Sequence, residues 1–134
     1  MNKIIVVGFL SLIMGSTGCN KDNTHTSLLG AWNCEEIPEK SASSIYQVNI
    51  VRNNLLPDST NQYVIYNFNQ LGLEEDRAVY IRQDSIGKLV ITGTEIIGIY
   101  IEGSGRVASD FSKIEWNYMI NKDVGNENFI ATYY

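Results

Sequence analysis

The clearest structural signal in this chain is residues 113–120, Lys113-Ile114-Glu115-Trp116-Asn117-Tyr118-Met119-Ile120. Apolar and polar side chains alternate along this segment: Ile114, Trp116, Tyr118 and Ile120 share one face, and Lys113, Glu115 and Asn117 share the other. Successive side chains of a β-strand point to opposite faces of its sheet. The segment is therefore predicted to be a strand with one buried face and one solvated face.

Similar short runs recur along the chain before and after this strand. They occupy residues 28–34, 45–51, 63–68, 78–81, 88–92, 96–102 and 129–134. Turn-forming residues separate them at roughly ten-residue spacing, which is typical of an antiparallel all-β domain. Short links favour a single meander of about eight strands. Such a meander covers its apolar face by closing into a small barrel; a two-layer sandwich is the alternative.

The first residues of the chain predict export and a cell-envelope location. Lys3 precedes an apolar run at residues 4–15, and small residues at 16–18 lead to Cys19. This order is typical of a secretory signal, and the run is shorter than the roughly twenty residues that cross a bilayer. The junction resembles the lipobox of bacterial lipoproteins, which implies cleavage before Cys19 and lipidation of its sulfur. We therefore expect a signal peptide at 1–18, the lipidated Cys19 and a flexible tether at 19–27, and the domain at 28–134.

Charge limits the partners of the domain. The chain carries 10 basic and 15 acidic side chains, for a net charge of −5. A mildly acidic chain with scattered charges argues against nucleic acid and against electrostatic adhesion to anionic lipid. Membrane contact is expected through the lipid on Cys19, which predicts a cell-envelope protein anchored to the outer membrane. Its periplasmic or surface-exposed orientation stays open.

The segment Leu29-Gly30-Ala31-Trp32 resembles the Gly-x-Trp motif that opens lipocalin-like (calycin-type) barrels. The resemblance implies that Trp32 plugs the closed end of a barrel. In that family an arginine from a late strand lies across the tryptophan. No arginine follows Arg106 in this chain, so the resemblance assigns Trp32 no such partner.

A broader resemblance is to small uncharacterised lipoproteins of Gram-negative bacteria. It covers nearly the whole mature chain and includes the lipobox, the Gly-x-Trp motif and three later segments. These are Tyr46-Gln47-Val48-Asn49-Ile50, Gly103-Ser104-Gly105 and Ile114-Glu115-Trp116-Asn117-Tyr118. The pattern implies a fold and carries no activity.

Residues able to support catalysis do not form a recognisable site. The carboxylate clusters Glu35-Glu36 with Glu39, and Glu74-Glu75-Asp76, fall in predicted loops or strand ends and are expected to be solvated. The single histidine, His25, lies in the predicted tether, so it activates no serine. Cys34, left without a disulfide partner, is expected to be a buried thiol. The prediction is a non-enzymatic protein with no metal site and no cofactor.

Aromatic residues are the best candidates for ligand contact. Six predicted mid-strand residues are candidates to line the barrel interior or one of its mouths: Tyr46, Tyr66, Tyr80, Tyr100, Trp116 and Tyr118. They suit a small apolar or sugar ligand, although the same residues also fill β-sheet cores. The resulting hypothesis is a binding module, or an accessory subunit of an envelope protein. The alternative is a proteinaceous inhibitor of an enzyme such as lysozyme, because Ser104-Gly105-Arg106 resembles the inhibitory loop of such lipoproteins.

Overall fold

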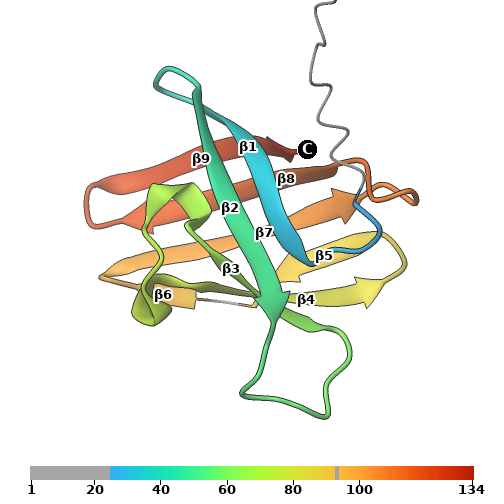
Figure 1. The fold of residues 1–134 in the computed structure, drawn as a ribbon. Helices are drawn as coiled ribbons and strands as arrows, with labels where there is room; N and C mark the ends of the chain where they lie inside the picture. Colours follow the sequence, from blue (N-terminus) through green and yellow to red (C-terminus); the bar gives the residue numbers. More distant parts are fainter. Residues whose placement is uncertain (1–24, 93) are drawn as a thin grey trace, which may run out of the picture.

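The computed structural model describes residues 25–92 and 94–134, which fold into nine strands and two short 3-10 turns (Figure 1). The strands are β1 (Gly30–Pro38), β2 (Ser44–Arg52), β3 (Gln62–Tyr66), β4 (Val79–Ser85), β5 (Lys88–Ile91), β6 (Thr94–Ile96), β7 (Ile99–Val107), β8 (Ile114–Lys122) and β9 (Gly125–Tyr133). The 3-10 turns, η1 (Phe68–Gln70) and η2 (Glu75–Arg77), lie between β3 and β4.

The strands close into a barrel. Each pairs antiparallel with its neighbour in the order β5-β4-β3-β2-β1-β9-β8-β7, and β5 also pairs with β7 to complete the ring. The short β6 is an additional strand that pairs with β7. The prediction of an all-β, eight-stranded antiparallel meander is confirmed, and the barrel rather than the sandwich is the form it takes.

Alternation along the strands fills the interior. Ile114, Trp116, Tyr118 and Ile120 all point inward from β8, as the sequence predicts, and each is at most 4% exposed. β1 and β9 contribute the same pattern from the two neighbouring strands. The largest fully buried side chains are Trp32, Trp116, Tyr133 and Phe68.

The Gly103-Ser104-Gly105 segment lies inside strand β7 and does not turn the chain. Gly103 is paired with Tyr118 and Gly105 with Trp116 across the β7–β8 ladder. A Cβ at Gly105 would lie 2.7 Å from the indole of Trp116, so the missing side chain makes room for that ring. The two glycines of β7 therefore leave the space that the aromatic side chains of β8 occupy.

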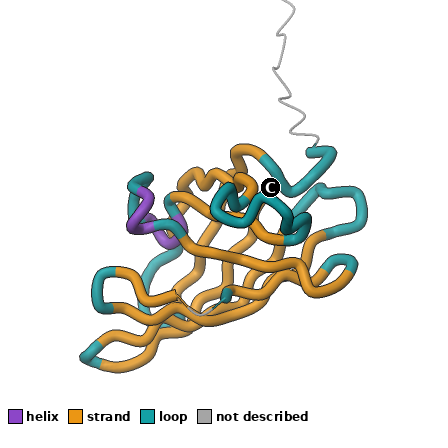
Figure 2. Tube along the Cα trace, turned by 90° about the horizontal axis from the view of Figure 1, so that it is seen from below, coloured by secondary structure: helices purple, strands orange, loops and turns teal. Residues whose placement is uncertain are grey.

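Because the strands alternate in direction, the connections fall into two sets. We call the rim where β1 begins the N-terminal rim; it also holds the β2–β3, β4–β5 and β7–β8 connections. The opposite rim, which we call the capped rim, holds η1 and η2 together with the β1–β2, β6–β7 and β8–β9 turns. Figure 2 shows the 3-10 turns at one end of the barrel. Within the described residues, none of the helical segments has the length and apolar character of a bilayer-spanning helix.

Candidate functional site

The six aromatic residues predicted as ligand-lining divide between the two faces of the barrel wall. Tyr46, Trp116 and Tyr118 point into the interior, where Trp116 and Tyr118 are buried and Tyr46 is partly buried. Tyr66, Tyr80 and Tyr100 alternate with inward-pointing residues of β3, β4 and β7, so they point outward. The six residues therefore do not line one common surface.

Trp32 is completely buried at the N-terminal rim. Its indole Nε1 donates a hydrogen bond of 3.0 Å to the carbonyl oxygen of Leu28. The imidazole of His25 stacks on the indole with ring centroids 3.6 Å apart and 6° between the planes. Burial lowers the pKa of His25, since desolvation disfavours the charged imidazolium. His25, assigned to the tether from sequence, is thus part of the packed rim.

A polar cluster lies inside the barrel near the capped rim. It consists of Glu36, Tyr46, Asn69 and Tyr118, and we call it the Glu36 cluster. Glu36 is 2% exposed, which corrects the expectation that its carboxylate is solvated. The expectation was wrong because β1 continues to Pro38, so Glu36 shares the inward face with Trp32 and Cys34.

Each carboxylate oxygen of Glu36 has a hydrogen-bond donor. Oε2 accepts the hydroxyl of Tyr46 at 2.6 Å and also the hydroxyl of Tyr118. Oε1 accepts the Nδ2 group of Asn69 at 3.0 Å, and the same Nδ2 donates to the Tyr118 hydroxyl at 3.1 Å. The cluster joins β1, β2 and β8 to the η1 turn. The buried Glu36 carboxylate and its compensating hydrogen bonds therefore link the η1 turn to the barrel wall.

Burial in the barrel interior keeps the tyrosine hydroxyls and the Cys34 thiol protonated at neutral pH. Burial is the main cause that raises the pKa of Tyr46 and of Tyr118; the nearby Glu36 charge contributes further to Tyr118. Burial likewise raises the pKa of Cys34 to about 12, so its thiol is not a nucleophile at neutral pH. The expectation of a buried Cys34 is confirmed.

The chemistry available to the Glu36 cluster is structural. It contains no histidine, and donors already engage both carboxylate oxygens. Within the described ranges 25–92 and 94–134, no group of three or more His, Cys, Asp or Glu residues is arranged to hold a metal ion. The sequence did contain a signal for Glu36: the alternation Trp32-x-Cys34-x-Glu36 continues the inward face of the first strand.

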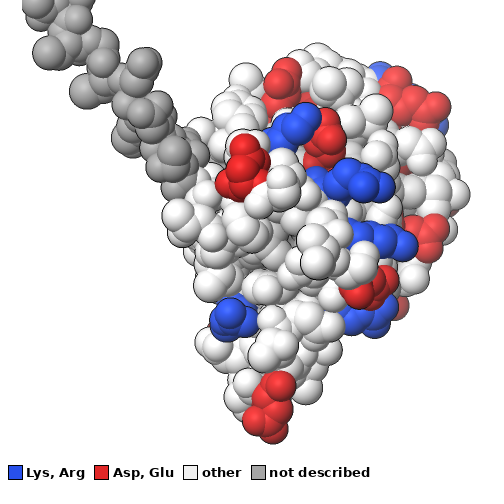
Figure 3. Space-filling view, turned by 90° about the vertical axis from the view of Figure 1, so that its right-hand side faces the viewer, with Lys and Arg blue, Asp and Glu red and all other residues white. Residues whose placement is uncertain are grey.

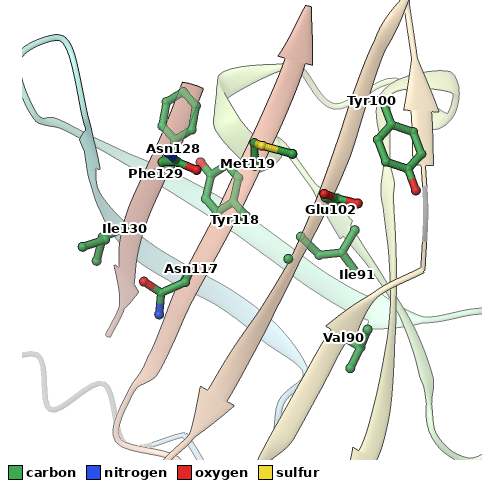
Figure 4. Close-up of a pocket in the computed structure, with 11 residues that line it drawn as sticks. Val90, Ile91, Tyr100, Glu102, Asn117, Tyr118, Met119, Asn128, Phe129 and Ile130 are labelled. Atoms are coloured by element: carbon green, nitrogen blue, oxygen red, sulfur yellow. The ribbon is translucent and has the colours of Figure 1, made fainter. Parts of the chain in front are cut away.

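A hollow of about 730 Å³ lies across β7, β8 and β9, with β5 at its edge, on the outside of the barrel (Figure 4). Its outward side chains include Val90, Tyr100, Glu102, Asn117, Met119, Asn128 and Ile130. Tyr100 is exposed, and cross-strand pairs place Glu102 beside Met119 and Asn117 beside Ile130. An exposed ring, amides, a carboxylate and aliphatic groups thus share one surface, which suits contact with an amphipathic ligand.

The segment Ser104-Gly105-Arg106 does not protrude from the barrel. Ser104 is paired with Val90 on one side and with Asn117 on the other, in the middle of β7. The loop on which the inhibitor alternative depended is therefore an ordinary, doubly paired part of the sheet.

Comparison with protein-family models and with curated proteins finds no match to this chain. The predicted signal peptide, Cys19 and most of the predicted tether fall within residues 1–24, outside the described residues.

Proposed function

We propose that this chain is a lipid-anchored lipoprotein of the cell envelope, held at the outer membrane through Cys19, that acts as a non-enzymatic binding or accessory module. Its ligand binds on the outer face of the barrel, in the hollow beside Tyr100. One observation carries this proposal: large side chains occupy the barrel interior, whereas the hollow on β7–β9 is accessible from outside. A small apolar or sugar ligand and an envelope protein both suit its chemistry.

A lipocalin-like, calycin-type relationship is part of the proposal. Support comes from the closed eight-strand meander and from a buried tryptophan in the first strand. The imidazole of His25 covers the indole of Trp32, in the role that an arginine takes in lipocalin-like barrels. A flat ring on the indole provides the same shielding from solvent as an arginine side chain.

Anchorage is tested with the two cysteines as a matched pair. The Cys19→Ala variant should move from the membrane fraction to the soluble fraction and lose lipid labelling. The Cys34→Ala variant removes the interior thiol and should stay in the membrane fraction. Retention of the Cys19→Ala variant in membranes would contradict anchorage.

Binding on the outer face is tested with two outward tyrosines. The protein is isolated from native membranes, and co-purifying proteins and small molecules are identified by mass spectrometry. We expect Tyr100→Ala to lose the bound component, while Tyr80→Ala, on a different part of the wall, keeps it. Equal recovery from both variants would count against the hollow as the binding site.

The inhibitor alternative has less support than the binding module. Its inhibitory segment would have to reach into another protein, and Ser104 lies mid-strand. Addition of the purified chain to lysozyme in a cell-wall lysis assay tests it directly; the binding module predicts undiminished lysis.

A further inference from the structure

Three aliphatic side chains project from the N-terminal rim into solvent. Leu55 and Leu56 lie in the β2–β3 loop and are 77% and 46% exposed. Ile86 lies in the two-residue β4–β5 turn and is 100% exposed. Exposed aliphatic groups of this kind are able to contact another apolar phase. Others, including Leu73, Ile97 and Val124, lie at the capped rim, so the position of the anchor decides which rim makes such a contact.

Hydrogen bonds hold the β2–β3 loop in this conformation. The buried Asn53 accepts the backbone N–H of Leu55 on its Oδ1 at 3.0 Å, and its carbonyl accepts the N–H of Leu56 at 3.2 Å. Ser59 then donates its N–H to the carbonyl of Leu56 at 3.0 Å. The two leucines are therefore presented outward by an ordered loop.

The length of chain before the barrel limits which rim meets a membrane. Cys19 is six residues before His25, which packs on Trp32 at the N-terminal rim. Six residues span at most about 21 Å, whereas a strand of nine residues is about 30 Å long. A lipid on Cys19 thus holds the N-terminal rim close to the bilayer and leaves the capped rim on the far side.

Charges on the N-terminal rim are of both signs. Figure 3 looks onto this end and shows acidic and basic side chains intermingled, beside uncharged surface. Two of the ion pairs, Arg82–Asp84 and Lys113–Glu115, lie close to it, with N–O distances of 2.6 and 2.9 Å. The rim therefore lacks a single-sign field that would attract anionic lipid, and its contact with a membrane depends on apolar side chains.

We infer that Leu55, Leu56 and Ile86 insert into the headgroup–acyl boundary of the membrane that carries the Cys19 anchor, so that the barrel stands on its N-terminal rim. The inference rests on the anchorage proposed above. Asp58, exposed in the same loop, keeps the insertion shallow because a carboxylate remains in the hydrated headgroup layer.

The test uses tryptophan reporters in the lipidated full chain. Leu55→Trp and Ile86→Trp report on the N-terminal rim. Ile97→Trp and Val124→Trp are matched controls at exposed turn tips of the capped rim, where the wild-type side chains are 64% and 95% exposed. The native Trp32 and Trp116 are fully buried and give a constant background.

Each protein is reconstituted into phosphatidylethanolamine–phosphatidylglycerol vesicles whose acyl chains carry bromine near the headgroup. Interfacial side chains reach about 5–10 Å into this boundary, so we expect roughly twofold stronger quenching at positions 55 and 86 than at 97 and 124. Flotation of the vesicles reports anchorage separately.

The inference is overturned if the protein floats with the vesicles but the tryptophans at 55 and 86 are not quenched, or if quenching is equal at both rims. Either result leaves the proposed Cys19 anchor intact. Loss of flotation overturns both. An envelope protein is the alternative occupant of these loops. In that case the vesicles alone leave the tryptophan reporters open to quenching by aqueous acrylamide, and only added envelope extract protects them. That result would also overturn the membrane inference.

Discussion

The imidazole of His25 lies flat on the indole of Trp32, with ring centroids 3.6 Å apart and an angle of 6° between the planes. This contact joins the residues before β1 to the first inward side chain of the barrel. The stacked pair shields the Trp32 end of the interior from water, and it makes the packed domain begin no later than His25. It also provides a titratable probe of the rim.

The pKa of His25 should be lower in the folded protein than in the unfolded chain, because burial against Trp32 disfavours the imidazolium. A lowered pKa means that the neutral ring stabilises the fold above the unfolded pKa. This contribution is lost as the pH falls through the folded pKa. His25 is the single histidine, so one NMR ring-proton titration, with the urea-unfolded chain as reference, measures it. A folded pKa equal to or above the reference would contradict the burial of the imidazole.

Replacement of Trp32 by alanine should lower the free energy of unfolding by about 3–5 kcal/mol, as is usual for deletion of a fully buried large aromatic side chain. Urea denaturation followed by circular dichroism measures the change. Leu29→Ala, three residues earlier and 37% exposed, is the control and should cost less than Trp32→Ala. A loss below about 1 kcal/mol for Trp32→Ala would show that the residue does not seal the rim.

Glu36→Ala should be strongly destabilising although it removes a charge from the interior. It leaves the Tyr46 and Tyr118 hydroxyls without their acceptor, at a cost of about 1–3 kcal/mol for each group. Glu35→Ala, outward on the same strand, should change stability by no more than about 0.5 kcal/mol. Equal effects in urea denaturation would mean that the Glu36 cluster contributes nothing to the fold.

Gly105→Ala should destabilise the protein by about 1–3 kcal/mol, because the new methyl group overlaps the Trp116 ring, which is itself fully enclosed. Ser104→Ala, outward on the same strand, is the control and should be nearly neutral. Thermal unfolding of the two variants distinguishes them. A stable Gly105→Ala variant would indicate that the indole moves freely aside.

Cys34 should react slowly with thiol reagents in the folded protein, since its pKa of about 12 leaves almost no thiolate at neutral pH. A Cys19→Ala background removes the other sulfur, and a colorimetric disulfide exchange assay follows the reaction. Urea should restore full reactivity. Rapid stoichiometric labelling of the native protein would place the thiol at the surface.

Alternation was sufficient to predict the inner face of β8. Ile114, Trp116, Tyr118 and Ile120 repeat every second residue, and the polar Glu115 and Asn117 on the opposite face leave one choice of buried face. The same local rule failed at Val79-Tyr80-Ile81, where three successive residues are compatible with burial. Only closure of the barrel turned Tyr80 outward and its two neighbours inward.

Local alternation indicated the inward face for Glu36, but the partners in the Glu36 cluster lay beyond what local pattern could predict. Asn69 is 33 residues from Glu36 along the chain, and Tyr118 is 82 residues away. A carboxylate is buried only when donors offset its desolvation, and those donors come from other elements. Asn69 reaches Glu36 from a backbone with φ of 50°, a left-handed conformation that asparagine tolerates but that no sequence period indicates.

The amino-acid sequence by itself determined the all-β meander, the approximate strand positions and the burial of Trp32 and Trp116, because these follow from side-chain alternation and from turn residues close along the chain. Tertiary structure alone decided which tyrosines face inward and where Glu36 finds its hydrogen bonds. Those features depend on contacts between strands far apart in sequence, and they exist only once the barrel has closed.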